Sequence, residues 1–417
     1  MQVKPVSDRG IRFPAYRGLF RAAVLGALLA ALTQAVQASE VSHGQPLTLA
    51  ARLAPANEPA VAADKADRPR IQVAIALDTS NSMDGLIDQT RNQLWQVVNE
   101  FSAARQNGVM PILEIALFEY GNDGIAASQG HVRKISGFTR ELDAVSEGLF
   151  SLTTNGGSEY CGFAIQSLVD SLQWSQSERD IKTIFIAGNE SFAQGPVNYR
   201  QAVRLAKRHG ISINTIHAGG HDEGISDQWQ AGALLAGGNY LSIDSNQQVV
   251  HIIAPQDEKI AELNARLNQT YVPYGAAGAV SAVRQMEQDR LSNDISTGLL
   301  AKRAASKSSG FYRNSGWDLV DAYDEDAVDA AEISEMEEAS LPEPMQGLSS
   351  QQRVDYVREK ARQRKQIQQE ILGLSESRAN YVAEQKREMA AAAPSMSDAL
   401  INAIRKEARQ KNFTLEN

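Results

Sequence analysis

The sequence predicts an α/β fold: a doubly wound, mostly parallel six-stranded sheet with helices on both faces, followed by a helical C-terminal region. Three observations support this prediction. Between residues 70 and 253, short apolar runs alternate with longer segments of helical periodicity. Gly210 and the pair Gly237-Gly238 stand where helices are expected to end. Beyond residue 255 the strand-like runs stop and helical patterns continue.

The elements follow one another in a regular order. Strands are predicted at 71–77, 112–118, 131–135, 181–187, 211–217 and 240–243, and helices at 84–105, 140–149, 160–173, 196–208 and 226–236. The short link between the second and third strands predicts an antiparallel hairpin at one edge. If the first strand is central, its neighbour across the reversal of strand order is strand 181–187, and the loops after both strands flank one crevice.

The first residues have the layout of a secretory signal peptide. Five basic residues (Lys4, Arg9, Arg12, Arg17 and Arg21) precede the apolar run 22–32, and small residues end at Ala38. We therefore predict a signal peptide over 1–38, a periplasmic or secreted mature protein, and no membrane span after cleavage. An uncleaved N-terminal anchor is the alternative. Residues 39–69, rich in Ala, Pro and charge, are predicted to be a disordered lead-in.

Composition argues against nucleic acid as a partner and against an internal disulfide as a source of stability. The formal charge is -9, with a pI near 5.3, so nucleic acid is not expected to bind. Cys161 is the single cysteine, so an internal disulfide is excluded. Its apolar neighbours indicate a buried small residue rather than a nucleophile.

The C-terminal half divides into three predicted parts. Residues 254–322 form a helical extension with an aromatic segment, 323–348 an acidic, solvated linker, and 349–417 the C-terminal helices. The first of these helices is predicted to stop near Gly373, the second to run over 376–393, and the third to carry Leu400 and Ile404. They are expected to pack on the main domain. Pairing with each other, as in a short coiled coil, and binding of a partner chain are the alternatives, although the spacing is too irregular for a long coiled coil.

The turn after the first strand carries the clearest chemistry. Asp78, Ser80 and Ser82 place one carboxylate and two hydroxyls between a buried strand and a helix. These are hard oxygen ligands, which suit Mg²⁺, Mn²⁺ or Ca²⁺ better than zinc. The alternative interpretation is that Asp78 and Ser80 only cap the following helix.

The strand, the Asp78-x-Ser80-x-Ser82 turn and the alternation over 70–253 resemble a von Willebrand factor type A domain. This resemblance implies a metal-ion-dependent adhesion site, in which a divalent ion, usually Mg²⁺, takes a carboxylate from a protein partner. It implies a Thr in a second loop, where Ser158 stands with Glu159 beside it. It also implies an Asp after the fourth strand, where Gly188 stands instead, so Asn189 or Glu190 would replace it.

A second polar cluster follows strand 211–217 at the same edge of the sheet. It consists of His217, His221, Asp222 and Glu223. A transition-metal site would need nitrogen ligands that converge there, and a simple polar loop is the preferred interpretation.

Three functions remain open. The first is a secreted binding module that uses the ion site to engage a partner's carboxylate, with no catalytic residues. The second is a metal-dependent hydrolase, for which Glu159 or Glu190 would be the base. The third is an envelope scaffold whose ion site has decayed, which the Gly188 departure keeps open. Neither a phosphate-binding Gly-Lys-Ser/Thr loop nor a Gly-x-Ser-x-Gly elbow occurs.

Overall fold

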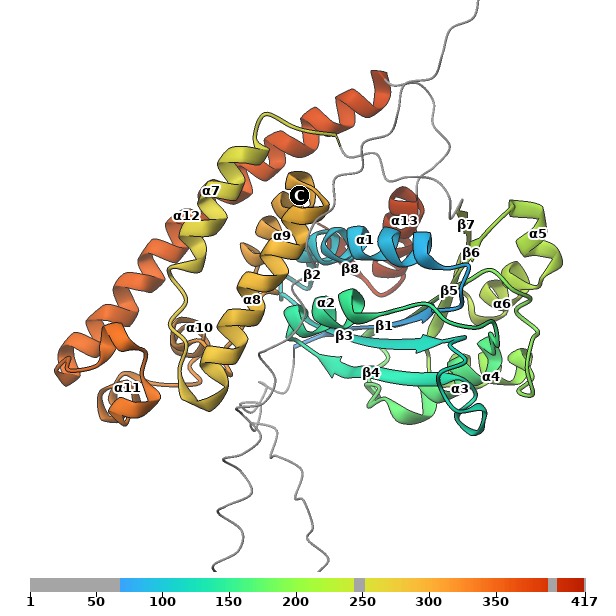
Figure 1. The fold of residues 1–417 in the computed structure, drawn as a ribbon, viewed down its shortest axis with the longest axis horizontal. Coiled ribbons are helices and arrows are strands. Elements are labelled where there is room, and N and C mark those ends of the chain that lie inside the picture. The colour runs from blue at the N-terminus through green and yellow to red at the C-terminus, as the bar shows by residue number, and fades with distance from the viewer. Residues whose placement is uncertain (1–67, 244–251, 389–395, 416–417) are drawn as a thin grey trace, which may run out of the picture. The chain divides into compact units, whose positions relative to one another are not determined.

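A six-stranded sheet forms the centre of the computed structural model, which describes residues 68–243, 252–388 and 396–415. The strands lie in the order β4-β3-β1-β5-β6-β7 (Figure 1). Their bounds are β1 Arg70–Asp78, β3 Ile112–Tyr120, β4 Val132–Thr139, β5 Ile181–Gly188, β6 Ser212–Ala218 and β7 Tyr240–Ile243. The predicted signal peptide and nearly all of the predicted lead-in lie outside the described residues.

The strand pairing confirms the predicted topology. β1 pairs in parallel with β3 on one side and with β5 on the other, so strand order reverses beside the central strand. β3 and β4 pair antiparallel, which is the predicted edge hairpin. The carboxyl ends of β1 and β5 are neighbours, with Leu77 opposite Ala187. The loops that follow these two strands therefore begin side by side.

Helices cover both faces of the sheet because alternate residues of the strands are apolar on each side. Ile71, Val73 and Leu77 of β1 pack with α1 (Asp84–Ser102) and α2 (Leu142–Ser151). Ala74 and Ala76 point to the other face. That face is covered by α3 (Cys161–Ser171), α4 (Tyr199–Arg208) and α6 (Trp229–Ala236) (Figure 1). A short helix, α5 (His221–Ser226), precedes α6.

Three predicted helix boundaries are wrong by three residues. The helix predicted over 196–208 begins at Tyr199. The helix predicted over 84–105 ends at Ser102, and Ala104–Gln106 form a strand, β2, that pairs with β8 (Phe413–Leu415). The helix predicted over 226–236 begins only at Trp229, after the separate helix α5. The β2–β8 pair joins segments about 300 residues apart, so local periodicity carries no signal for it.

The C-terminal region is almost entirely helical. Its helices are α7 Asp257–Asn268, α8 Gly275–Ile295, α9 Thr297–Lys307, α10 Leu319–Asp324, α11 Ala330–Glu335, α12 Ser350–Glu388 and α13 Met396–Gln410. α12 packs against α7 and α9, and α13 packs against α1 and β7. Packing on the main domain, the preferred expectation, is therefore observed.

The predicted break at Gly373 is wrong, because α12 continues through it as one helix of 39 residues. A terminating glycine adopts a positive φ, and Gly373 is not among the described glycines that do. Residues 323–348 also contain more structure than a linker. Their acidic side chains are mostly exposed, as predicted, but Ile333, Leu341 and Met345 are buried against Val354 and Val357 of α12.

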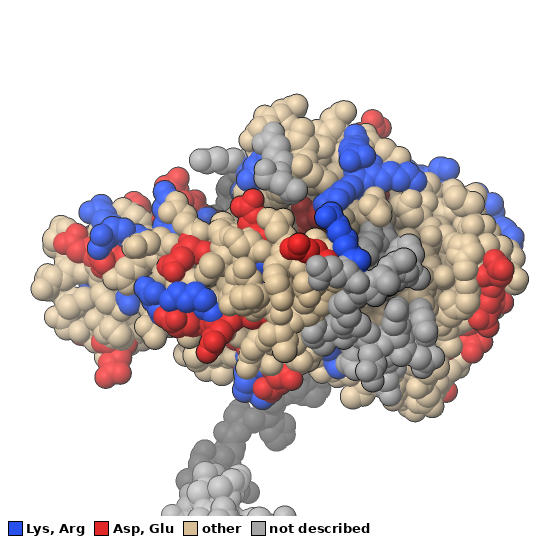
Figure 2. Space-filling view, turned by 90° about the horizontal axis from the view of Figure 1, so that it is seen from above, with Lys and Arg blue, Asp and Glu red and all other residues tan. Residues whose placement is uncertain are grey.

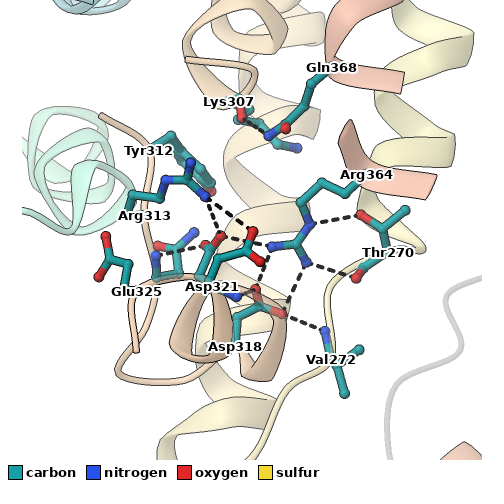
Figure 3. Close-up of polar contacts among 12 residues, drawn as sticks. Thr270, Val272, Lys307, Tyr312, Arg313, Asp318, Asp321, Glu325, Arg364 and Gln368 are labelled. Atoms are coloured by element: carbon teal, nitrogen blue, oxygen red, sulfur yellow. Dashed lines mark hydrogen bonds and ion pairs between the residues drawn. The ribbon is translucent and has the colours of Figure 1, made fainter. Parts of the chain in front are cut away.

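A buried cation holds α12 to the rest of the helical region (Figure 3). The Arg364 guanidinium donates to Asp318 Oδ2 at 2.6 Å and to Asp321 Oδ1 at 3.0 Å. It also donates to the carbonyl oxygen of Thr270 at 2.8 Å. Arg313 pairs with Asp321 from the other side, at 3.1 Å. Since every partner is buried or half-buried, this network fixes the position of α12.

A second buried cation joins the helical region to the sheet. Arg303 of α9 donates to Asp143 of α2 and to Asp289 of α8, both at 2.6 Å. Its guanidinium also lies over the Trp95 ring of α1, 4.6 Å from the centroid. Arg303 is fully buried, and the two carboxylates compensate its charge. None of the helices within the described ranges combines the length and the apolar character needed to cross a bilayer.

Candidate ion site at the end of the central strand

The site is built on the turn between β1 and α1. Asp78 is the last residue of β1 and is fully buried, and its Oδ1 accepts the backbone N–H of Ser80 at 2.8 Å. Ser80 Oγ lies 3.2 Å from Ser82 Oγ. The carboxylate and the two hydroxyls of the predicted motif therefore share one turn, with the carboxylate folded back toward the serines.

The second loop contributes Glu159 rather than Ser158. Backbone hydrogen bonds from Asn155 N to Thr79 O, at 2.9 Å, and from Asn81 N to Gly156 O, at 3.0 Å, hold this loop against the turn. Glu159 is 2% exposed, and its Oε2 and Asp78 Oδ2 both lie 3.3 Å from the same side-chain amide atom of Asn189. Ser158 forms a β-bridge with Gly121 through its backbone. The structure thus places Glu159, the charged neighbour of Ser158, at the site.

The third loop contributes Asn189. Its side-chain amide has one atom 3.3 Å from Asp78 Oδ2, Glu159 Oε2 and Ser82 Oγ. With the NH₂ in this position the amide donates to both carboxylates; turned the other way, it presents Oδ1 to them. Glu190 acts through its backbone, because its N–H donates to Glu159 Oε2 at 3.2 Å while its side chain is exposed.

Gly188 stands where the resemblance implies an Asp, and the structure gives a steric reason. A Cβ at this position would lie 2.4 Å from Tyr120 Oη and 3.1 Å from the Trp229 ring. Tyr120 is held there because its hydroxyl donates to Ala187 O at 2.9 Å. A side chain at residue 188 therefore does not fit beside Tyr120.

Two residues that the sequence interpretation missed shape the site. Tyr120 occupies the space beside Gly188, and Gly121 lies directly against Asp78. A Cβ on Gly121 would be 2.4 Å from Asp78 Oδ1, and its φ is +83°. The sequence feature that could have identified them is the Tyr-Gly pair just after the predicted second strand, at the same edge of the sheet.

The two carboxylates are electrostatically uncompensated by basic side chains. Burial raises the pKa of Asp78 well above 3.8, and the adjacent Glu159 raises it further. Burial likewise raises the pKa of Glu159. Among the described residues, Asp78 and Glu159 form no ion pair with Lys or Arg. Two such carboxylates in contact need either a shared proton or a bound cation.

The groups next to the site do not compensate the charge of Asp78 and Glu159. Cys161 is buried, as predicted, with Sγ 3.6 Å from Tyr120 Oη, and burial raises the pKa of its thiol. His217 is buried, with Nε2 3.2 Å from Asn189 O, while Asp222 and Glu223 are exposed on α5. His221 packs on Tyr240 instead. The four residues of the second cluster therefore do not converge, which favours the polar-loop interpretation.

The donor set suits a hard cation. It offers two carboxylates, two hydroxyls and one amide oxygen, from Asp78, Glu159, Ser80, Ser82 and Asn189. No group of three or more His, Cys, Asp or Glu side chains that could hold a metal occurs in the part of the chain that the structure describes. The composition of this set therefore fits Mg²⁺, Mn²⁺ or Ca²⁺ and is a poor one for zinc or copper.

Comparison with known proteins adds little beyond the fold. No family model and no curated protein matches the chain. Among solved structures, the conserved hypothetical protein BatB from Bacteroides thetaiotaomicron is 15% identical, over 42% of this chain and 90% of that chain, with a TM-score of 0.33. The VWA domain of SpRpn10 is 16% identical over 43% and 91%, with a TM-score of 0.31.

A third solved structure contains a metal ion. It is proximal thread matrix protein 1 from the mussel byssus with a zinc-occupied MIDAS motif, 12% identical over 43% of each chain, with a TM-score of 0.31. These identities and TM-scores are too low to support a statement on function. The sheet order and the position of the Asp78 turn are those expected from the resemblance, so the described residues 70–243 have the fold of a von Willebrand factor type A domain.

Proposed function

We propose that this chain is a protein-interaction module that binds a divalent cation between Asp78 and Glu159 and uses it to engage a carboxylate of a partner. The observation that carries the proposal is the buried pair of carboxylates without a basic neighbour. A helix cap would need only one carboxylate, and it would not bring in Glu159 and Asn189 from two other loops. We expect Mg²⁺ or Mn²⁺ as the ion, with Ca²⁺ as a weaker alternative.

The residues have separate roles in this proposal. Asp78 and Glu159 supply the charge, and the hydroxyls of Ser80 and Ser82 supply neutral oxygens. Asn189 supplies the amide oxygen that the third loop offers in place of an Asp. Ser82 and Asn81 are exposed, so the site opens to solvent on the side of the turn. A bound ion supplies a Lewis-acid position for an outside carboxylate oxygen.

The first test measures ion binding directly. Calorimetric titration with Mg²⁺ and with Mn²⁺ should show binding to the wild type and none to Asp78→Asn, which keeps the shape but removes the charge. Glu159→Gln should weaken binding by at least about tenfold. Ser158→Ala separates the two candidates of the second loop: binding as in the wild type leaves Glu159 as the ligand from this loop, whereas a loss of binding adds the Ser158 hydroxyl.

The second test concerns the partner. Proteins captured from the cell envelope with Mg²⁺ present should be lost on chelation and in Asp78→Asn. Capture that is unaffected by both would instead favour the metal-independent scaffold. Turnover of a phosphoester panel that disappears in Asp78→Asn and Glu190→Gln would favour the hydrolase and contradict a purely binding role. In agreement with the predicted signal peptide, we propose that the protein acts in the periplasm or outside the cell.

A further inference from the structure

A cluster of basic side chains lies at the end of the sheet opposite the ion site. Arg179 precedes β5, Lys207 and Arg208 precede β6, and Arg105 lies in β2. The C-terminal segment adds the rest. We call this set the basic face: Arg105, Arg179, Lys207, Arg208, Arg405, Lys406, Arg409 and Lys411. The face is notable because the chain as a whole has a formal charge of -9.

Hydrogen bonds show that these segments meet. Gln106 Nε2 donates both to Arg179 O, at 3.0 Å, and to Lys411 O, at 2.8 Å. Lys411 Nζ donates to Glu178 O at 2.6 Å, and Lys406 Nζ donates to Asn239 Oδ1 at 2.9 Å. The basic face is therefore a product of tertiary structure and is completed by α13 and β8.

The eight basic side chains of this face outnumber four nearby carboxylates, which are Glu100, Glu178, Asp180 and Glu407. Glu100 pairs with Arg405, and Asp180 accepts hydrogen bonds from Arg70 N and from Ser175 Oγ. The carboxyl of Glu407 is turned inward, where it accepts a hydrogen bond from Ser212. Lys207, Arg208, Lys406 and Arg409 are exposed. Figure 2, which views the molecule from above, shows a band of Lys and Arg side chains on one part of the surface, with Asp and Glu side chains next to it.

The surface is open rather than enclosed. Two shallow hollows flank β8, and each contains one carboxylate: Glu100 lies with Arg405 and Arg409 in the first, and Glu178 lies with Arg179 and Lys411 in the second. Two exposed large apolar side chains of the described residues border the face: Val109 lies close to β2, and Leu234 is next to Leu235, whose carbonyl accepts a hydrogen bond from Lys207. A protein interface is usually centred on aromatic or clustered apolar anchors. No aromatic side chain is among the exposed large apolar residues described, so the charge of this face fits an array of lipid headgroups better.

We propose that the basic face docks on an anionic lipid surface, which leaves the opposite end of the sheet, with Asp78, directed away from the membrane. Each basic side chain near such a surface contributes roughly a fivefold increase in binding, and salt weakens it. This inference does not depend on ion binding at Asp78.

The test compares two triple charge reversals in the full chain. One, Arg208→Glu with Lys406→Glu and Arg409→Glu, changes the basic face. The control, Lys259→Glu with Arg290→Glu and Arg362→Glu, makes the same change in net charge on exposed residues of α7, α8 and α12. Each protein is sedimented with vesicles of phosphatidylcholine alone, or mixed with phosphatidylglycerol in roughly equal parts.

The measured quantity is the ratio of binding to the anionic and the neutral vesicles, since binding that does not depend on lipid charge contributes to both. We expect a ratio of at least about ten for the wild type and the control, falling with added salt, and a ratio near one for the basic-face variant. A wild-type ratio near one, or an equal loss in both variants, would overturn the proposal.

Two further results keep the test decisive. If the basic-face variant does not fold, as judged by its melting temperature, the salt dependence of the wild-type ratio decides, and a ratio insensitive to salt contradicts the proposal. Binding of polyglutamate by the basic face, without preference for anionic vesicles, would assign the face to an acidic protein and also overturn it.

Discussion

At the scale of single residues, the ion site differs from the expected pattern by one exchange between loops. The resemblance implies a hydroxyl in the second loop and a carboxylate in the third. The structure has the carboxylate of Glu159 in the second loop and the amide of Asn189 in the third. Tyr120 occupies the space beside residue 188, which leaves no room for a carboxylate there. The second carboxylate of the site therefore comes from Glu159 in the second loop. Both arrangements offer hard oxygens, so the chemistry of the site is preserved.

Gly188 provides the first prediction at this scale. Gly188→Ala should lower the free energy of unfolding by about 1–3 kcal/mol, because the new Cβ collides with Tyr120 Oη and the Trp229 ring. Gly157→Ala, in the second loop, is the control, since no atom lies within 4 Å of a Cβ there. Chemical denaturation measures both. Equal stability of the two variants would show that Tyr120 does not exclude a side chain.

At the scale of elements, α12 is a continuous helix despite Gly373. An exposed glycine in a helix interior costs about 1 kcal/mol relative to alanine. Gly373→Ala should therefore stabilise the protein by up to about this amount, because its position is open and its φ is not positive. Gly108→Ala, at a φ of +77°, should give no such gain. A loss of stability in Gly373→Ala would indicate a break in α12.

The contact between α13 and the sheet predicts a dependence of stability on pH. Glu407 is half-buried as a residue, but its Oε2 is buried without a hydrogen-bond partner. Burial raises the pKa of Glu407 from 4.5 to about 7. The folded state therefore holds this proton more tightly than the unfolded chain does. The stability associated with it is lost as the pH rises from 4.5 to about 7, and no more is lost above that.

Glu407→Gln isolates this effect, because the amide cannot ionise. Between these pH values the wild type should lose up to about 3 kcal/mol more than the variant, as measured by urea unfolding at each pH. A difference between wild type and variant that does not change with pH would show that Glu407 ionises as it does in the unfolded chain.

At the scale of the whole molecule, buried ion pairs join the helical region to the sheet. Arg303→Ala should destabilise the protein by about 3–5 kcal/mol, because Asp143 then remains buried without its cationic partner and Asp289 keeps only Lys307. Arg290→Ala, which breaks exposed pairs on α8, should cost at most about 1 kcal/mol. If the Arg303 variant unfolds in a separate early step, the helical region and the sheet are independent units. A single transition would show that they unfold together.

The sheet and the charged turn could be predicted from the sequence because their signals are local. Each strand is a short apolar run, and Asp78, Ser80 and Ser82 lie within five residues of one another. The strand order followed from the reversal at the central strand, which general rules for parallel sheets supply. Glu159 and Asn189 were among the candidates because they follow predicted strands or loops at the same edge.

Only the tertiary structure decided which candidates meet. Ser158 and Glu159 are adjacent in the sequence, and only the folded loops show that Glu159 Oε2 and Asp78 Oδ2 lie 3.3 Å from the same Asn189 atom. The β2–β8 pair, the continuity of α12 and the basic face likewise depend on contacts between distant segments. The physical reason is that local periodicity shows which side of an element is apolar, whereas the partner of that side is determined by packing across the whole chain.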